Sequence, residues 1–172
     1  LGLLEKLLPE LTAVPGVERV RVSYLQPAEV RPGLLAAMAD TPGVMPWYDL
    51  SFQHSSETVL RRMRRFGGTE PFLDLIGRVR DRQPLAGVRS NVIVGFPGET
   101  EADFTQTLEV VREARFASAF TFQYSKRPGT PAASMGGQVP KALVQERYER
   151  LVEVGEEVAW AENRAFLGAD DA

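Results

Sequence analysis

The sequence lacks cysteine altogether and has a single histidine, His54, among its 172 residues. Without cysteine, this chain can form no disulfide, no thiolate metal site and no cysteine nucleophile. One histidine argues against a histidine zinc site and against a Ser-His-Asp triad, and a lone histidine is more often a structural residue than a catalyst. Residue types alone therefore assign neither a catalytic residue nor a metal ligand.

Long apolar runs are also missing, and no stretch of the sequence is long enough to cross a membrane. The first residues, "LGLLEKLLPELTAVPG", are amphipathic and carry neither a basic leader nor a small-residue cleavage site, unlike a signal peptide. Together with the absence of cysteine, this favours a cytoplasmic protein. The chain also lacks an initiator Met and opens within an expected helix, which favours a piece of a longer protein.

Charge is distributed unevenly along the chain, although the net charge is only −3. Residues 61–89 carry eight arginines against three acids, whereas residues 140–172 carry eight acids against four basic residues. A basic centre beside an acidic end can contact a nucleic acid or an acidic protein. The simpler alternative, which the pattern leaves open, is that both regions are solvated helix faces.

Segments with strand and helix periodicity alternate along the chain, and the connections are long enough for crossovers. This order predicts an α/β fold with about four parallel strands and flanking helices, as either a barrel or an open sheet. The expected strands are 17–25, 47–53, 87–96 and 116–125. The expected helices are 3–14, 31–40, 55–66, 70–83, 100–115 and a long final helix opened by Pro140.

Three of these helices begin with a residue that can cap them. Ser56 and Thr69 are predicted N-caps, because their hydroxyls can accept a hydrogen bond from the first helical turn. Thr100 with Asp103 three residues later has the pattern of a capping box.

Ligands of parallel α/β sheets gather at the carboxyl ends of the strands. Those positions here are Gln26, 53–56, 95–99 and 124–130. In "VIVGFPGE", the glycines allow either a tight structural turn or a close approach of a ligand to the backbone. Gln53 has no obvious structural role, whereas Ser56 is explained by helix capping. Lys126 and Arg127 can hold a carboxylate or phosphate, or can be solvated loop residues.

Two stretches, "LSFQHSSETVLRRMRR" and "NVIVGFPGETEADF", resemble segments of the radical S-adenosylmethionine (SAM) methylthiotransferases. The resemblance covers nearly the whole chain. It implies that residues 1–139 are the C-terminal part of a partial (β/α)6 radical SAM barrel of the TIM type. It also implies that residues 140–172 form a helix leading toward a TRAM domain.

Different parts of the chain resemble two different branches of this family. Residues 1 to about 103 resemble RimO, the branch that methylthiolates an aspartate of a small-subunit ribosomal protein. Residues from about 104 to 172, including "REARFASAFTFQYSKRPGTPAA", resemble MiaB, the branch that methylthiolates a tRNA adenosine. The sequence therefore predicts either a chimera joined within the shared stretch or an unusual natural homologue, with a ribosomal protein or tRNA as partner.

The resemblance implies SAM as cofactor, with iron–sulfur clusters in the full-length family. Cluster ligation requires thiolates, which this chain lacks, so the isolated chain is expected to be inactive. By resemblance, Val92, Ile93, Gly95, Phe96, Gly98 and Glu99 would line the adenine. Gln53 and Ser56 would face the ribose or methionine of SAM, and Tyr124 and Arg127 would form the substrate rim.

Two other functions stay open at this point. The chain can instead be a cluster-free, non-catalytic module that binds ribosomal protein or tRNA through residues 61–89. It can also be an unrelated α/β enzyme, although no plausible catalytic pair is present. A partial barrel leaves strand edges without partners, so self-association or partial unfolding is expected as well.

Overall fold

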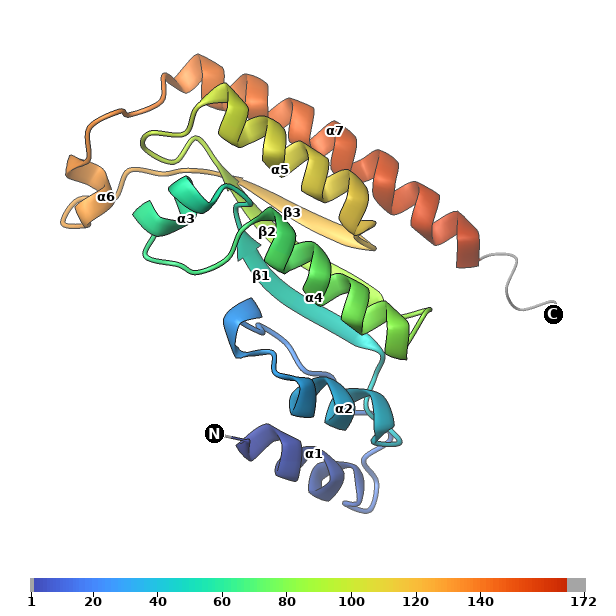
Figure 1. The fold of residues 1–172 in the computed structure, drawn as a ribbon. Helices are drawn as coiled ribbons and strands as arrows, with labels where there is room; N and C mark the ends of the chain where they lie inside the picture. Colours follow the sequence, from blue (N-terminus) through green and yellow to red (C-terminus); the bar gives the residue numbers. More distant parts are fainter. Residues whose placement is uncertain (1, 167–172) are drawn as a thin grey trace.

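The protein forms a three-stranded parallel sheet with helices on one side (Figure 1). The structure is a computed structural model that describes residues 2–166. The strands are β1 (Trp47–Gln53), β2 (Gly87–Val94) and β3 (Ser118–Gln123), in the order β1-β2-β3. Parallel neighbours joined by helical crossovers confirm the α/β class.

Helices alternate with these strands along the chain. They are α1 (Leu3–Thr12), α2 (Pro32–Asp40), α3 (Glu57–Arg62), α4 (Thr69–Arg82), α5 (Glu101–Ala114), α6 (Pro131–Ser134) and α7 (Lys141–Phe166), with a 3₁₀ turn, η1 (Pro27–Glu29). In Figure 1, α4, α5 and α7 lie along one side of the sheet, whereas α1 and α2 pair with each other beyond β1. No helix within residues 2–166 is long and apolar enough to cross a membrane. The last six residues of the expected C-terminal segment lie outside the described residues.

The expected first strand, residues 17–25, is not a strand of the sheet. It forms only two isolated parallel bridges, Val20 with Val44 and Leu25 with Leu50. Four residues (21–24) separate the two bridges in the first segment, whereas five (45–49) separate them in the second. A continuous ladder therefore cannot form. Tyr24 marks the slip, because its φ of 61° lies in the left-handed region. The alternation in the sequence predicted an extended segment but could not reveal this mismatch.

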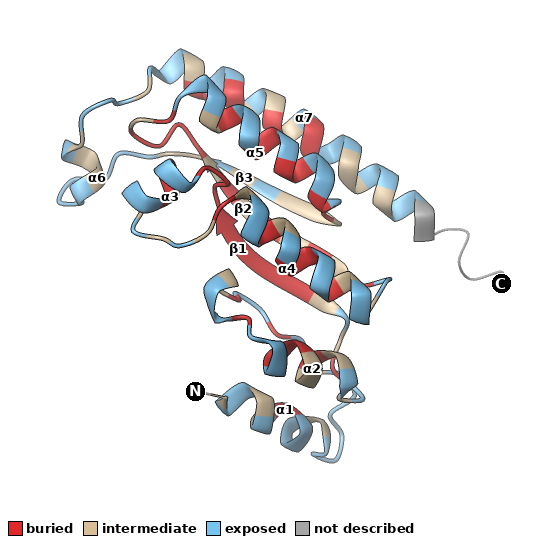
Figure 2. Ribbon diagram, viewed as in Figure 1, coloured by how far each residue is buried: buried red, intermediate tan, exposed pale blue. Residues whose placement is uncertain are grey.

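The two faces of the sheet differ in what covers them. Burial alternates along β2, so that Ser90 and Val92 are buried whereas Asn91 and Ile93 are only half-buried. The parallel register places Phe120 beside Asn91 and Phe122 beside Ile93, and these two rings are 47% and 50% exposed. One face is therefore packed under helices, and the other is open along β2 and β3. Figure 2 shows that β1 is buried along nearly its whole length, whereas β3 is paler.

Helices α4, α5 and α7 supply the side chains that cover the packed face. Phe72 of α4 stacks on Phe52 of β1 with ring centroids 4.0 Å apart, and Phe104 of α5 is fully buried. Helix α7 lies against β3 at Gly155, where an added Cβ would make an ordinary van der Waals contact with Ala119 at 3.8 Å. This packing fixes the strand ends, where the expected site residues lie.

Two of the three predicted helix caps are confirmed. The Ser56 hydroxyl accepts from the Val59 N–H at the start of α3, and Thr100 and Asp103 form the reciprocal capping box of α5. The prediction for Thr69 is wrong. Gly68 is the N-cap, Thr69 is already helical, and its hydroxyl has no hydrogen-bond partner among the described residues.

The outer edge of β3 has no partner strand within residues 2–166. An open parallel edge offers unpaired N–H and C=O groups to another chain. Self-association through this edge stays a prediction.

Candidate binding cleft at the strand ends

A cleft of about 670 Å³ opens at the carboxyl ends of the three strands. This volume lies within the range of about 300–1,000 Å³ typical of small-molecule sites. Its apolar and amide lining comes mainly from the strands and the loops that follow them, in Gln53, Asn91, Ile93, Phe96, Phe122 and Tyr124. Four arginines line it as well: Arg62, Arg64 and Arg65 from the end of α3 and the loop after it, and Arg127 from the loop after β3.

Five of the residues expected to bind cofactor or substrate meet in this cleft. They are Gln53, Ile93, Phe96, Tyr124 and Arg127. Gly95 lines a smaller neighbouring cavity of about 370 Å³, together with Lys126 and Val144.

The other four expected residues are not among the cleft-lining residues. Ser56 is buried, caps α3 and donates to Asp103, and Val92 belongs to the helix-covered face of β2. Gly98 lies against Arg62, where any Cβ would clash with the guanidinium. The Glu99 carboxylate is fully buried in an ion pair.

The loop after β2, residues 95–99, requires its glycines for packing. Gly95 and Gly98 have φ values of 77° and 85°, in the region that favours glycine. A Cβ on Gly95 would clash with Val144 of α7. The Gly98 N–H also donates to the Gly137 carbonyl at 2.7 Å. The glycines of "GFPGE" are thus needed for a tight structural turn. Phe96 of the same loop lines the cleft.

A one-residue bulge orients Gln53 at the end of β1. The register between β1 and β2 shifts between Leu50 and Gln53, and Gln53 has a φ of 69°. The Ser90 hydroxyl stabilises the irregular backbone, because it donates to the Leu50 carbonyl at 2.7 Å and accepts from the Phe52 N–H at 3.3 Å. A left-handed non-glycine residue at a cleft is the kind of local strain that functional sites retain.

Two buried polar atoms of cleft residues lack partners within the described part of the chain, Asn91 Oδ1 and the Tyr124 hydroxyl. A buried polar atom without a hydrogen bond is costly, so each of these atoms is a candidate to bond a ligand or an ordered water. The Tyr124 ring also packs edge-on against Phe96, with centroids 5.3 Å apart. Asn91 was missed by sequence reasoning. Its signal was a single amide within the apolar strand sequence "NVIV".

The arginines give the cleft a positive potential. Within residues 2–166, none of Arg62, Arg64, Arg65 and Arg127 forms an ion pair with a carboxylate. Arg62 and Arg65 instead donate to neutral oxygens, the Pro97 carbonyl and the Gln26 side chain. Cations without local counter-charges attract anionic ligands.

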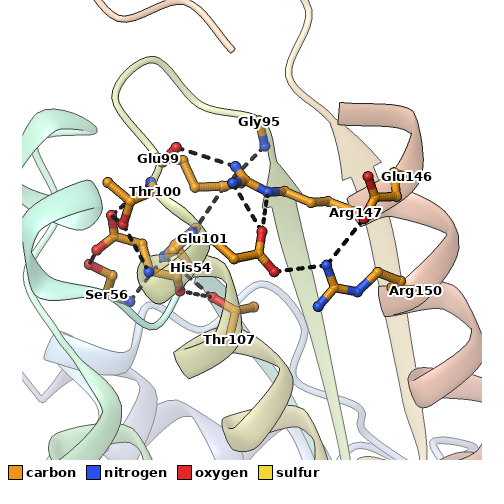
Figure 3. A network of polar contacts seen from close by, with 11 residues as sticks. His54, Ser56, Gly95, Glu99, Thr100, Glu101, Thr107, Glu146, Arg147 and Arg150 are labelled. Carbon is orange, nitrogen blue, oxygen red and sulfur yellow. Dashed lines mark hydrogen bonds and ion pairs between the residues drawn. The ribbon is translucent and has the colours of Figure 1, made fainter. Parts of the chain in front are cut away.

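Behind the cleft lies a buried polar network (Figure 3). Arg147 Nη1 lies 2.8 Å from Glu99 Oε1, and both side chains are at most 3% exposed. Glu99 Oε2 accepts from the Gly95 N–H at 3.0 Å and contacts His54 Nε2 at 3.2 Å. His54 is bonded at both ring nitrogens, in agreement with its interpretation as a structural residue.

Two carboxyls at the edge of this network have altered pKa values. Burial raises the pKa of Glu101, but the hydrogen bonds and charges of Arg150 and Arg147 outweigh burial and bring it below its ordinary value. The pKa of Asp103 is lowered in the same way, because hydrogen bonds from Ser56 and Thr100 outweigh its burial. Both groups are therefore held in the ionised form at neutral pH.

Sequence reasoning also missed Arg147. The sequence predicted only a long final helix opened by Pro140 and gave no role to its charged residues. The available signal was a charged residue placed between Val144 and Leu151, both of which are buried. Within the described residues, no group of three or more acidic or histidine side chains could hold a metal ion.

Comparison with known families gives a match to the Radical SAM superfamily over residues 3–111. Among curated proteins, the chain is 57% identical to the ribosomal protein uS12 methylthiotransferase RimO of Kineococcus radiotolerans, over 96% of this chain and 34% of that protein. It is 55% identical to the tRNA-2-methylthio-N(6)-dimethylallyladenosine synthase of Streptomyces viridosporus, over 95% of this chain and 32% of that protein. The chain thus spans about a third of the length of these relatives.

Relatives of both names match nearly the whole chain at similar identity, so these identities do not locate a junction near residue 103. The chimera stays a prediction.

Two solved structures share the fold. Coproporphyrinogen III oxidase (HemN) from Escherichia coli, a radical SAM enzyme, superposes with a TM-score of 0.63 and 19% identity, over 80% of this chain and 32% of that chain. The radical SAM methyltransferase TsrM from Kitasatospora setae superposes with a TM-score of 0.59 and 18% sequence identity, over 75% of this chain and 26% of that chain. Together with the family match over residues 3–111, these likenesses confirm that the sheet and its helices are part of a TIM-like radical SAM barrel.

Proposed function

Since this chain belongs to the radical SAM superfamily, we propose that it is the later part of the catalytic domain of a methylthiotransferase and that its cleft binds SAM. The proposal is supported by the agreement between the names of the relatives and the position of the cleft. Relatives named for methylthio transfer match at 55–57% identity, and the cleft lies at the carboxyl ends of the strands, where a barrel binds its ligand.

The cleft residues fit the adenosine part of SAM. Ile93 and Phe96 offer apolar surface for a flat ring, and glycine at position 95 keeps the adjoining backbone free of a Cβ. Asn91 Oδ1 can accept a hydrogen bond, and the Tyr124 hydroxyl can donate or accept one, and neither atom has such a bond within the described residues. Gln53 can bond the ribose from the opposite wall.

An iron–sulfur cluster, by contrast, does not fit the residues of this chain. Clusters of this type are held by cysteine thiolates, and the chain has none. We propose that the ligands belong to a part of the protein outside these 172 residues and that this chain alone does not cleave SAM. Its own contribution is to bind and orient the cofactor. No acid, base or nucleophile is assigned.

The substrate of the whole protein is either ribosomal protein uS12 or a tRNA adenosine, the two targets in the relatives' names. The cleft favours the tRNA, because four arginines without carboxylate partners suit a phosphodiester backbone. Both targets imply the cytoplasm as location. No separate observation favours a non-catalytic, cluster-free module.

The test is isothermal titration of the 172-residue chain with SAM. Ile93→Asp, which places a carboxylate on the apolar floor of the cleft, is expected to weaken binding at least about tenfold. Leu85→Asp is the matched control, because Leu85 is 66% exposed and does not line the cleft. Failure of the chain to bind SAM, or equal binding by Ile93→Asp, would overturn the proposal.

A further inference from the structure

Helix α7 holds the loop after β2 at two points. Val144 packs against Gly95 at the start of the loop, and Arg147 pairs with Glu99 at its end. These two residues of α7 are three positions apart and therefore share a helix face. Phe96, the cleft residue of this loop, lies between the two points of contact.

The Glu99 carboxylate is the centre of this arrangement. One oxygen accepts from the Gly95 N–H at 3.0 Å, so the carboxylate ties the end of the loop to its beginning. The same oxygen contacts His54 Nε2 at 3.2 Å, whereas His54 Nδ1 accepts from the Ser56 N–H at 3.0 Å. That pattern assigns the neutral tautomer with hydrogen on Nε2, which donates to Glu99. His54 therefore adds a hydrogen bond but no positive charge.

Arg147 supplies the charge that Glu99 needs. Besides its 2.8 Å contact with the carboxylate, Arg147 Nη1 donates to the Glu99 backbone carbonyl at 3.2 Å. No other lysine or arginine within residues 2–166 pairs with Glu99. A buried carboxylate without its cation would have to move toward water or become protonated. In either case its bond to the Gly95 N–H would be lost or weakened.

We propose that Arg147 is a positioning residue that sets the shape of the loop 95–99, through Glu99, and so tunes the affinity of the cleft for the adenosine group. This inference rests on the proposed function for its ligand, and on the buried contacts alone for its structural part. It couples the C-terminal helix to the cleft: any partner or domain that shifts α7 changes the loop that carries Phe96.

Arg150 provides a matched control for Arg147. It lies on the same helix, pairs with Glu101 at 2.8 Å and sits over the Phe104 ring at 4.9 Å, as Arg147 does at 5.6 Å. It makes no contact with Glu99. A change that follows Arg147 but not Arg150 therefore reports the buried contact with Glu99, and a change common to both reports the contacts that they share, with Glu101 and Phe104.

The experiment combines amide hydrogen exchange, read at Gly95 by NMR, with titration of the chain by SAM. In the unmodified protein, the Gly95 amide is expected to be as protected as the amides within β2. Arg147→Met should speed its exchange at least about tenfold and weaken SAM binding by a similar factor. Arg147→Lys should restore most of the protection, and Arg150→Met should leave both readouts within about twofold of the unmodified protein.

The outcomes separate this inference from the proposed function. If the unmodified chain does not bind SAM, the proposed function fails, whereas the exchange data still decide the role of Arg147. If SAM binds but Arg147→Met leaves the Gly95 exchange unchanged, or matches Arg150→Met in both readouts, the inference is overturned. Fast Gly95 exchange in the unmodified protein overturns it without any variant, so the test survives even if Arg147→Met does not fold.

Discussion

The loops after β2 and β3 line the same cleft, yet they are built in opposite ways. Residues 95–99 are mostly buried, carry two glycines with positive φ and are held by Arg147, Val144 and Gly137. Residues 125–130 are all exposed, and their hydrogen bonds are local, such as Thr130 N–H to the Arg127 carbonyl. One wall of the cleft is rigid and the other is free to adapt.

This difference matches the two proposed tasks of the cleft. A cofactor that is the same in every turnover benefits from a preorganised wall, because little entropy is lost when it binds. A large substrate is better met by exposed residues such as Arg127, which can adjust to it. Changes in the two loops should therefore separate stability and cofactor binding from substrate binding.

The largest effect is expected from Glu99→Ala, which removes the buried carboxylate from Arg147 and leaves it only the half-exposed Glu101 as an ion-pair partner. Removing one partner of a buried ion pair typically costs about 3–5 kcal/mol of unfolding free energy. The matched change in the exposed loop, Arg127→Ala, should cost less than about 0.5 kcal/mol. Urea denaturation measures both, and a loss below about 1 kcal/mol for Glu99→Ala would show that the β2 loop does not depend on this pair.

A smaller effect is expected from Gly95→Ala. Its Cβ would meet Val144 and would also force alanine into a φ of 77°, so we expect a loss of about 2–4 kcal/mol. Gly129→Ala measures the cost of the positive φ alone, because Gly129 in the β3 loop has a φ of 81° and no atom lies within 4 Å of the added Cβ. It should cost about 1 kcal/mol. Equal losses in thermal melts would mean that Val144 does not constrain the β2 loop.

Substrate binding should respond to the arginines around the adaptable wall. Arg64→Glu combined with Arg127→Glu is expected to weaken binding of a tRNA anticodon stem-loop at least about tenfold and to reduce its salt dependence, since two phosphate contacts are lost. Filter binding at several salt concentrations measures this. Arg78→Glu, which changes an arginine paired with Asp74 on α4, is the control. An unchanged salt slope would instead favour the ribosomal protein as substrate.

The smallest effect concerns Asp103, which supports the rigid wall through Ser56 and Thr100. Because its pKa in the folded protein lies below the ordinary value of 3.8, it adds stability above that pH and loses it as pH falls through the folded pKa. Unfolding free energy should therefore drop more between about pH 4 and pH 2 in the unmodified protein than in Asp103→Asn. Identical pH profiles would contradict the lowered pKa.

Much of this architecture follows from local sequence patterns. The alternation of strands and helices, the caps at Ser56 and Thr100, and the position of the cleft at the strand ends all depend on neighbouring residues or on topology. They were predictable because periodicity and capping act over a few residues.

What could not be predicted depends on contacts between distant segments. The one-residue mismatch that stops residues 17–25 from joining the sheet appears only when two segments are counted against each other. The pairing of Arg147 with Glu99 joins residues 48 positions apart, and Glu99 therefore lies behind the cleft rather than in it. Likewise, only the register of β2 shows that Asn91, rather than Val92, faces the cleft.

The most direct test of the central claim is photo-crosslinking of the chain with an azidoadenine analogue of SAM, followed by peptide mapping. The account predicts label on the peptides that contain Ile93, Phe96 or Tyr124, and loss of that label when unmodified SAM is in excess. Label confined to α1 or α2, or label that excess SAM does not displace, would contradict the claim that the strand-end cleft is a SAM site.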